Sequence, residues 1–221
     1  MSHPNRLEYM DLTDEALIDK YREEGDMTLF KTLVKRYQNR VYSTAFRVVG
    51  SSEEAEEVVQ DTFVKVHQNL DKYRSSSSFA SWLFRIAHNL CMDNLRVKQR
   101  RKPMTLVSFD PQSSVAEDEG AGSFGQTLSQ LADERPDPSQ NLDLREQTRM
   151  VEDSLSQLPE TQKIVLVLHD IEGFSYIEIA EMVGANIGTV RSRRHYGRIK
   201  LKELLSPYFS TDSLNLPATF R

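Results

Sequence analysis

The stretch between residues 158 and 205 constrains the fold most, because it is typical of two helices separated by a tight turn. Ser175 precedes Glu178 by three residues, the spacing of a capping box at the start of a helix. Apolar residues then recur at helical spacing as far as Gly184, and glycine ends a helix at little conformational cost. Asn186 can cap the next helix. The sequence therefore predicts a helix-turn-helix.

The second helix of this pair is strongly basic. Arg, Ser, Thr and His side chains on one helix suit the base edges and phosphates of a DNA major groove. An amphipathic helix with a basic solvent face would have the same composition, so this helix alone leaves both interpretations open. The candidate DNA-binding residues are Thr189, Arg191, Ser192, Arg194, His195, Tyr196 and Arg198.

Residues 12–102 predict a compact all-α domain, because apolar residues recur there at helical spacing in four successive segments. No alternation typical of a strand interrupts them. The expected helix starts are Thr13 or Asp14, Asp26, Ser52 and about Phe79.

Three polar patches on this domain are candidate functional sites, and each also has an ordinary explanation. The third helix carries an acidic-polar face that fits a solvated surface. A run of serines before the fourth helix fits a loop that caps it. Basic residues toward the end of that helix fit favourable charge at a helix C-terminus. The three patches are Glu54, Glu57, Gln60 and Asp61; Ser75, Ser76, Ser77 and Ser78; and Arg85, Arg96, Lys98, Arg100, Arg101 and Lys102.

These stretches, taken in order, resemble the two domains of the extracytoplasmic-function sigma factors, a branch of the sigma-70 family. The first stretch has Glu54, Ala55, Glu56, Gln60, Asp61, Phe63, Tyr73-Arg74, Phe79, Trp82-Leu83, Arg85-Ile86-Ala87, Asn89, Asp93 and Arg100-Arg101. The second has Leu158-Pro159, Gln162, Asp170-Ile171-Glu172-Gly173-Phe174-Ser175-Tyr176, Glu178-Ile179-Ala180 and Gly188-Thr189-Val190-Arg191-Ser192-Arg193. Two independent stretches in the family's order are more specific than either helix pattern.

The resemblance implies an all-α fold of two small helical domains joined by a long flexible acidic linker. Residues 12–102 would form the N-terminal domain, 103–149 the linker, 150–205 the helix-turn-helix domain and 206–221 a short tail. The acidic face of the third helix would grip the clamp coiled coil of RNA polymerase. The helix-turn-helix would read the promoter −35 element as duplex DNA.

The resemblance also assigns recognition and opening of the −10 element to the serine loop and the fourth helix. An unpaired base needs a pocket and a flat group on which to stack. Phe79 and Trp82 are the available aromatic groups, although both fit the domain core equally well. The implied −10 residues are Ser75, Ser76, Ser77, Ser78, Phe79, Trp82, Arg85, Asn89, Lys98, Arg100 and Arg101.

The chain departs from the family in its last helix. Arg194 and Tyr196 stand where the family more often has an apolar residue and a base-reading arginine. Gly197 lies in the helix interior, where glycine costs up to about 1 kcal/mol relative to alanine. These departures affect which promoter is read rather than the fold.

The implied partners are core RNA polymerase, through its clamp coiled coil and flap, and promoter DNA, double-stranded at −35 and single-stranded at −10. An anti-sigma factor is a further partner that the resemblance allows. The net charge of −5 argues at first against nucleic acid. However, the positive charge is segregated, and a local basic face matters more than the total.

The sequence predicts neither an enzyme nor a cofactor or metal site, because the five histidines are scattered and no Gly-rich phosphate loop is present. The single cysteine, Cys91, excludes an intrachain disulfide and indicates a reducing compartment. No apolar run approaches the roughly 18 residues of a membrane helix, and the N-terminus lacks the pattern of a signal peptide. We therefore expect a cytoplasmic protein without membrane insertion. The alternative function is a helix-turn-helix repressor or activator that acts without loading polymerase, although no dimerisation helix is evident.

Overall fold

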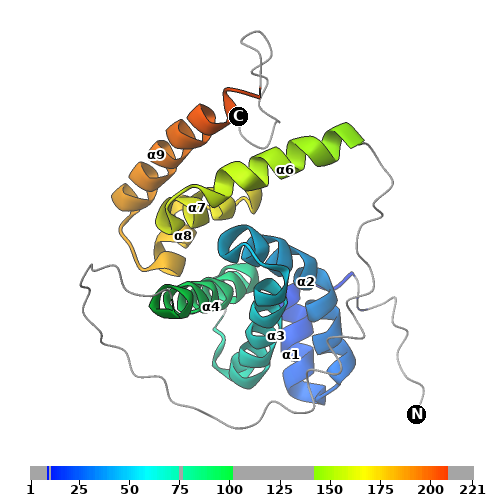
Figure 1. Cartoon of the computed structure of the whole chain (residues 1–221). Coiled ribbons are helices and arrows are strands. Elements are labelled where there is room, and N and C mark those ends of the chain that lie inside the picture. Colours follow the sequence, from blue (N-terminus) through cyan, green and yellow to red (C-terminus); the bar gives the residue numbers. More distant parts are fainter. Residues whose placement is uncertain (1–8, 10, 75–76, 102–141, 209–221) are drawn as a thin grey trace.

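Helices make up all the regular structure of the residues that the computed structural model describes, which are 9, 11–74, 77–101 and 142–208 (Figure 1). The side chains of residues 101 and 142–147 lie outside that description. The first group of helices is α1 (Asp14–Glu24), α2 (Met27–Val49), α3 (Ser52–Asn69), the short η1 (Leu70–Lys72) and α4 (Phe79–Arg101). The second group is α6 (Leu142–Ser156), α7 (Glu160–Leu166), η2 (Val167–Ile171), α8 (Tyr176–Val183) and α9 (Ile187–Leu205).

The all-α prediction with two helical domains is confirmed, and most helix ends follow from the capping residues. The side chain of Thr13 accepts a hydrogen bond at the start of α1, and that of Asp26 at the start of α2. Gly25 and Gly50 end these helices in the left-handed conformation. The third helix starts at Ser52 as expected, and the side chain of the preceding Ser51 provides its cap.

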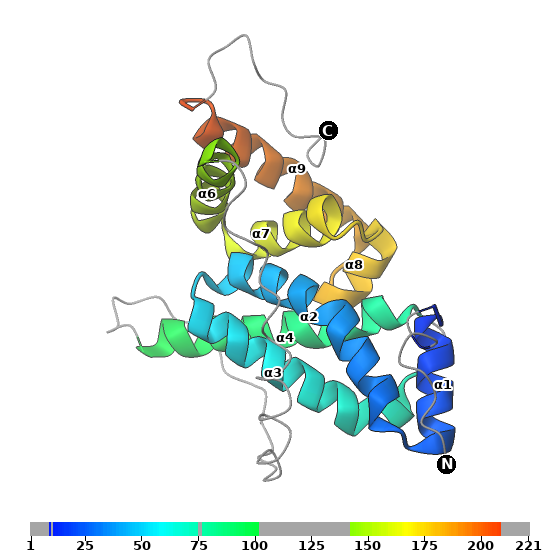
Figure 2. The ribbon, with the colours of Figure 1, turned by 90° about the vertical axis from the view of Figure 1, so that its right-hand side faces the viewer.

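The first four helices bury their apolar faces against one another. α2 lies against α1, α3 and α4, and Figure 2 shows it crossing the middle of the domain. Its buried face includes Phe30, Leu33 and Val41, which meet Phe63 of α3 and Leu83 of α4 in one core. This packing leaves the outer face of α3 to solvent, with Glu57, Gln60 and Asp61 exposed on it.

The second group contains one element that periodicity did not predict. After α7 the chain widens into a π-helical turn, η2, in which the N–H of Glu172 donates to the carbonyl of Val167 at 3.0 Å. Such turns are rare and often occur at functional sites. Gly173 follows with a φ of 81° and lets the chain turn sharply into α8.

Helix α6 starts at Leu142, inside the segment 103–149 that was expected as linker. Its sequence is rich in Leu, Glu, Arg and Gln, which are strong helix formers, so propensity outweighed the acidic composition. Leu155 of α6, with Leu158 just after the helix, packs against Leu201 and Leu205 of α9. Residues 102–141, the rest of that expected linker, lie outside the described part, as do residues 209–221 of the tail.

The two helical groups pack directly on each other. α8 lies on α4, and α6 and α7 reach α2, an arrangement visible in Figures 1 and 2. Residues of α7, η2 and α8 therefore belong to the same buried cluster as the first domain. Among the described residues, no helix has the length and apolar character to cross a bilayer.

Candidate nucleic-acid interface

Helices α8 and α9 form the predicted helix-turn-helix. The Ser175 side chain accepts from the N–H of Glu178 at 3.3 Å, while the Glu178 carboxylate accepts from the N–H of Ser175 at 2.9 Å. This is the capping box expected from the sequence. Gly184 ends α8 with a φ of 63°, and the Asn186 side chain accepts from the N–H of Thr189 to start α9. These caps fix the turn between the two helices.

The predicted −35 residues fall into two environments on α9. Arg191, Ser192, His195 and Tyr196 are exposed, and the Tyr196 side chain reaches 62% exposure. Thr189, Arg194 and Arg198 are half-buried instead. The exposed group therefore forms one solvent face along the N-terminal half of the helix, where a major groove would meet it.

The two half-buried arginines share one carboxylate, Asp170 of η2. Arg194 Nη2 lies 2.7 Å from Asp170 Oδ1, and Arg198 Nη2 lies 3.2 Å from the same oxygen. Only 4% of the Asp170 side chain is exposed. Arg194 Nη1 also donates to the hydroxyl of Tyr176 at 2.8 Å. The hydrogen bond from Arg194 to Asp170 raises the pKa of the guanidinium above its already high value.

Gly197 is explained by close helix packing. A Cβ atom at this position would lie 2.9 Å from Leu166 Cδ1 and 3.4 Å from Gln162 Cβ of α7. The glycine thus allows α9 to approach α7 more closely than any other residue would. Its cost in helix propensity is offset by this contact, which fixes the position of α9 in the domain.

The predicted −10 residues lie along α4 and before it. Arg85, Asn89, Lys98 and Arg100 are exposed, whereas the side chain of Arg101 lies outside the description. Phe79 is only 1% exposed and is therefore a core residue. Trp82 is half-buried, with its ring centroid 5.3 Å from that of Tyr73 and 6.0 Å from that of Phe79.

The serine loop is only partly described, because Ser75 and Ser76 lie outside the described residues. The carbonyl of Ser77 accepts from the Tyr73 hydroxyl at 2.8 Å. Ser78 accepts from the N–H of Ser81 at 3.2 Å at the start of α4. The capping role expected for this loop is therefore present at Ser78, and it does not conflict with a role in binding DNA.

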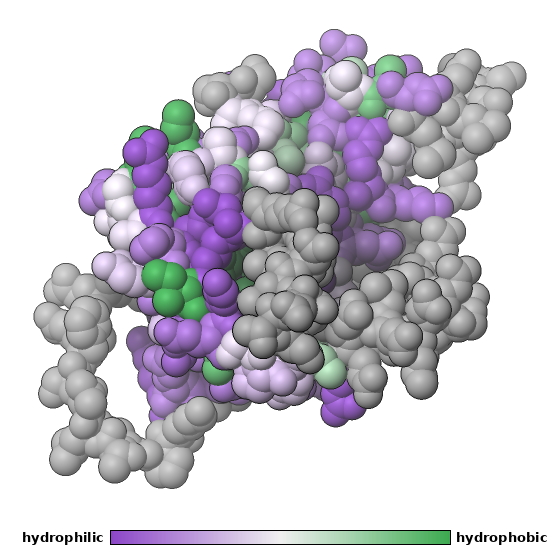
Figure 3. Space-filling model, turned by 90° about the horizontal axis from the view of Figure 1, so that it is seen from above, coloured by the Kyte–Doolittle hydropathy of each residue, from purple (hydrophilic) through white to green (hydrophobic). Residues whose placement is uncertain are grey.

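The predicted polymerase-binding residues lie on α3. Glu57, Gln60 and Asp61 are exposed on its outer face. Glu54 is half-buried, and its carboxylate lies 3.0 Å from Lys98 Nζ of α4. This ion pair joins the acidic face of α3 to the basic residues of α4. Seen from above, the described surface is mostly hydrophilic, with small and separate hydrophobic areas (Figure 3).

Sequence reasoning missed the residues that join the two helical groups. Glu172 accepts from Arg40 Nε at 3.0 Å and from the Thr44 hydroxyl at 2.9 Å. Ser81 of α4 donates to the Glu178 carboxylate at 2.7 Å. The rings of Phe84 and Phe174 meet edge to face at a centroid distance of 5.1 Å. These contacts link residues about 90 to 130 positions apart, and no local pattern predicts such pairs.

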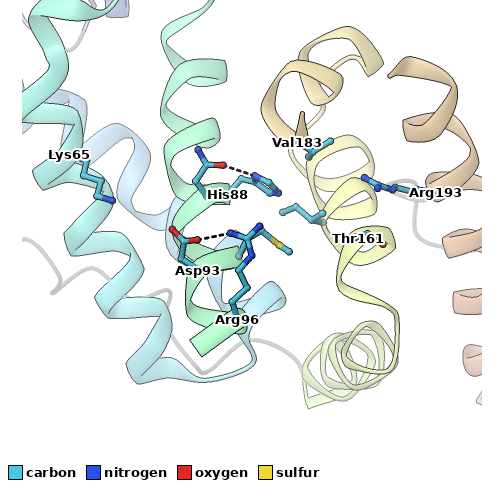
Figure 4. Close-up of a pocket in the computed structure, with 10 residues that line it drawn as sticks. Lys65, His88, Asp93, Arg96, Thr161, Val183 and Arg193 are labelled. Atoms are coloured by element: carbon cyan, nitrogen blue, oxygen red, sulfur yellow. Dashed lines mark hydrogen bonds and ion pairs between the residues drawn. The ribbon is translucent and has the colours of Figure 1, made fainter. Parts of the chain in front are cut away.

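A pocket of about 490 Å³ lies between α4 and the second helical group (Figure 4). His88 lines it, and burial lowers the pKa of its imidazole, with smaller lowering contributions from Arg96 and Arg193. Arg96 pairs with Asp93 at 2.9 Å. Among the residues whose positions are described, no His, Cys, Asp and Glu side chains gather in a group that could hold a metal ion. Other lining residues include Lys65, Thr161, Val183 and Arg193.

Two parts of the chain match known protein families. Residues 33–101 match the family described as Sigma-70 region 2, and residues 148–201 match Sigma-70, region 4. The first match includes the acidic face, the serine loop and the basic positions of α4. The second match includes α8, the turn that follows it and most of α9.

Curated relatives match over nearly their whole length. The chain is 34% identical over 196 residues to the ECF RNA polymerase sigma-E factor of Haemophilus influenzae, covering 89% of this chain and 97% of that protein. It is 30% identical over 187 residues to the ECF RNA polymerase sigma factor SigW of Bacillus subtilis, covering 84% and 94%.

Solved structures have the same fold. The sigma factor RpoE in complex with the anti-sigma factor NepR, from Bartonella quintana, matches with a TM-score of 0.58 and 26% identity, over 80% of this chain and 96% of that one. CnrH in complex with the cytosolic domain of CnrY matches with a TM-score of 0.58 over 88% and 97%. Its identity is 23%, so that likeness concerns the fold alone.

Proposed function

The chain belongs to the extracytoplasmic-function sigma factors of the sigma-70 family, and from that premise we propose how its surfaces divide the work of promoter recognition. As a member of that family, it is a promoter-specificity subunit of RNA polymerase, whose binding partners are core polymerase and promoter DNA. The observation that carries this function is the presence of both sigma-70 regions in their order along one chain.

The outer face of α3 binds the clamp coiled coil of core polymerase. Glu57, Gln60 and Asp61 support this role because they are exposed and lie along one face of the helix. Glu54 is the inner edge of the surface, since its carboxylate is already paired with Lys98. The charge of this face suits a basic partner surface.

The start of α4 and the loop before it open the −10 element. Trp82 is the group on which an unpaired base stacks, because it is half-buried rather than buried and its ring packs against those of Tyr73 and Phe79. Phe79 is buried and holds the Trp82 ring in place rather than touching DNA. Ser75 to Ser78 line the captured base, and the accessible polar groups Arg85, Asn89, Lys98 and Arg100, with Arg101, hold the DNA backbone.

The helix-turn-helix reads the −35 duplex, with α9 in the major groove. Arg191, Ser192 and His195 support this placement, because they are exposed on the N-terminal half of the helix. Tyr196 occupies the position beside them and reads a thymine methyl more readily than a guanine, since it lacks the two donors of an arginine. Thr189, Arg194 and Arg198 complete the set of proposed −35 residues.

The flap of core polymerase and an anti-sigma factor are the further proposed partners. The second is supported by the structure of RpoE from Bartonella quintana, which is held with the anti-sigma factor NepR. Because the chain acts with RNA polymerase, we place it in the cytoplasm, and the factor itself carries no catalytic site. A helix-turn-helix regulator that never loads polymerase is the competing function, and the region 2 match speaks against it.

Reversing the charge on the α3 face tests this function. We expect the double variant Glu57→Lys and Asp61→Lys to bind core polymerase roughly tenfold more weakly, the effect of losing about 1.4 kcal/mol. Its fold is retained because both side chains are exposed. Binding of the full chain to core, with transcription from a library of randomised promoters, gives the result.

The matched control is Glu23→Lys plus Glu24→Lys, the same charge change on exposed positions of α1. Equal affinity of the α3 and α1 variants for core would remove the clamp assignment. If the wild-type chain directs no promoter-selective transcription with core, the sigma function itself is wrong.

A further inference from the structure

We infer that Arg194 is not a base-reading residue but, together with Asp170 and Tyr176, an anchor that sets the pose of α9 and thereby the −35 preference. This inference rests on the proposed −35 function and changes the role of one of its residues. The anchor consists of these three side chains, and Arg198 lies at its edge.

The hydrogen bonds of Arg194 carry the inference. Its guanidinium donates from Nε to Asp170 at 3.2 Å, from Nη2 to Asp170 at 2.7 Å and from Nη1 to the Tyr176 hydroxyl at 2.8 Å. All three nitrogens therefore already have partners. A bidentate contact to guanine needs two N–H groups on one edge of the same fork. Two N–H groups remain, one on Nη1 and one on Nη2, but the Arg194 side chain is only 21% exposed. Turning the guanidinium toward a guanine edge would therefore exchange its bonds to Asp170 and Tyr176 for bonds to the base.

Burial makes that exchange unfavourable. The Asp170 side chain is 4% exposed, so removing Arg194 would leave this carboxylate, in a place that water scarcely reaches, with the longer 3.2 Å pair to Arg198. A buried charge that loses part of its compensation is more costly than an intact buried pair. Arg194 itself is only 21% exposed, and its ring neighbour Tyr176 stacks on His169 with centroids 4.5 Å apart.

The anchor joins three elements that must keep a fixed geometry for α9 to read bases. Asp170 belongs to the π-helical η2, Tyr176 is the first residue of α8, and Arg194 lies in the middle of α9. The π-turn shifts the register of the residues that follow its start relative to an α-helix, and Asp170 lies within it. A change at Asp170 therefore alters the angle of α9 without touching any exposed residue.

The same geometry assigns distinct roles to the other arginines. Arg191 is exposed, and its guanidinium lies 5.6 Å from the centre of the Tyr176 ring. Tyr176 of the anchor therefore positions Arg191 through a cation–π contact, which leaves the N–H donors of Arg191 for DNA. Arg198 shares the charge of Asp170 at 3.2 Å and is 30% exposed. Neutralising Asp170 would release the charge of both Arg194 and Arg198 toward DNA phosphates.

The test compares Asp170→Asn, Arg194→Gln and the double variant, each as full chain assembled with core polymerase. The measurements are selection from promoters with randomised −35 elements, and the salt dependence of binding to a selected and a scrambled −35 duplex. Thermal unfolding and circular dichroism are recorded beside them. Glu203→Gln is the control, because it removes the same charge from an exposed ion pair, with Lys200, on the same helix.

We expect Asp170→Asn to steepen the salt dependence on both duplexes by roughly one, the contribution of one more phosphate contact. We expect its preference for the selected duplex to fall about fivefold or more, the low end of one lost base contact. Arg194→Gln should relax several −35 positions together. The double variant should select the same −35 sequences as Arg194→Gln, because Asp170 affects that preference through Arg194. Glu203→Gln should behave as wild type.

Two results would overturn the anchor. One is a change at a single −35 base pair in Arg194→Gln while Asp170→Asn selects the wild-type sequence, since Arg194 would then read a base. The other is that Asp170→Asn and Arg194→Gln weaken binding to both duplexes equally, leave the salt slope unchanged and lower the melting temperature. The three residues would then have a purely structural role. A wild-type holoenzyme with no −35 preference would refute the proposed −35 function instead.

Discussion

Gly197 illustrates how one residue can be misjudged from sequence alone. By helix propensity it is a defect, and an alanine there would stabilise an exposed helix by up to about 1 kcal/mol. In the structure the missing Cβ is the site of contact between α9 and α7, because Leu166 lies 2.9 Å from where that atom would be. Leu166 is buried with Leu155 and Leu201, so it has little room to move.

We therefore predict that Gly197→Ala destabilises the chain, by about 1 kcal/mol or more, because overpacking outweighs the gain in propensity. The change is read from the midpoint of chemical unfolding. Leu166→Val in the same chain supplies the missing room, and the double variant should recover part of the loss. A higher midpoint in Gly197→Ala alone would show that the contact is not tight.

At the scale of elements, the helix caps of the helix-turn-helix could be predicted from sequence, whereas the π-helical turn before it could not. Ser175, Glu178, Gly184 and Asn186 fix the helix-turn-helix through contacts spanning three or four residues, and such contacts are visible in sequence. The π-turn of η2 has no comparable signal, since its apolar run fits an α-helix equally well. The anchor that depends on it was therefore missed, and Arg194 was assigned to DNA from its position alone.

The Glu178 carboxylate has two roles. It accepts from the N–H of Ser175 in the capping box of α8, and it accepts from Ser81 of α4 in the first helical group. Burial alone would raise the pKa of Glu178, but hydrogen bonds from Ser81 and Ser175 outweigh it and lower the pKa below the ordinary 4.5. A carboxyl whose pKa is lowered by folding stabilises the folded state above its unfolded pKa. That contribution is lost as the pH falls through the folded value.

We predict that Glu178→Gln lowers the free energy of unfolding by about 1 kcal/mol at pH 7, somewhat less than a fully buried hydrogen bond to a charged group contributes, because Glu178 is only half-buried. The difference from wild type should shrink as the pH falls below about 4.5. Unfolding curves in urea between pH 3.5 and 7 measure it, with the exposed Glu181→Gln as control on the same helix. If the difference in unfolding free energy between Glu178→Gln and wild type stays constant with pH, the effect comes from changed packing rather than from the lost charge.

At the scale of the molecule, a small set of contacts holds the two helical groups together. Glu172 accepts from Arg40 and Thr44, and only 6% of its side chain is exposed. Phe174 is also 6% exposed and meets Phe84 edge to face. These are side chains of the turn that carries Asp170, so one segment orients the recognition helix on one side and docks the first domain on the other.

We predict that Phe174→Ala with Glu172→Gln separates the two groups while each keeps its helices. Truncating a buried phenylalanine typically costs about 3–5 kcal/mol, and part of that loss falls on the contact between the groups. Energy transfer between dyes on cysteines at positions 71 and 202, both exposed, measures the separation. The native Cys91 should stay unlabelled, because burial raises the pKa of its thiol to about 12.

Transfer should fall in the double variant, while circular dichroism keeps its helical signal. Ile177→Ala is the control, because it removes an apolar side chain three residues after Phe174, in α8, at a position that is 61% exposed. Unchanged transfer in the double variant would mean that α6 and α7 hold the groups together on α2 without Phe174 and Glu172. Lower transfer in the control as well would trace the change to α8 itself rather than to this contact.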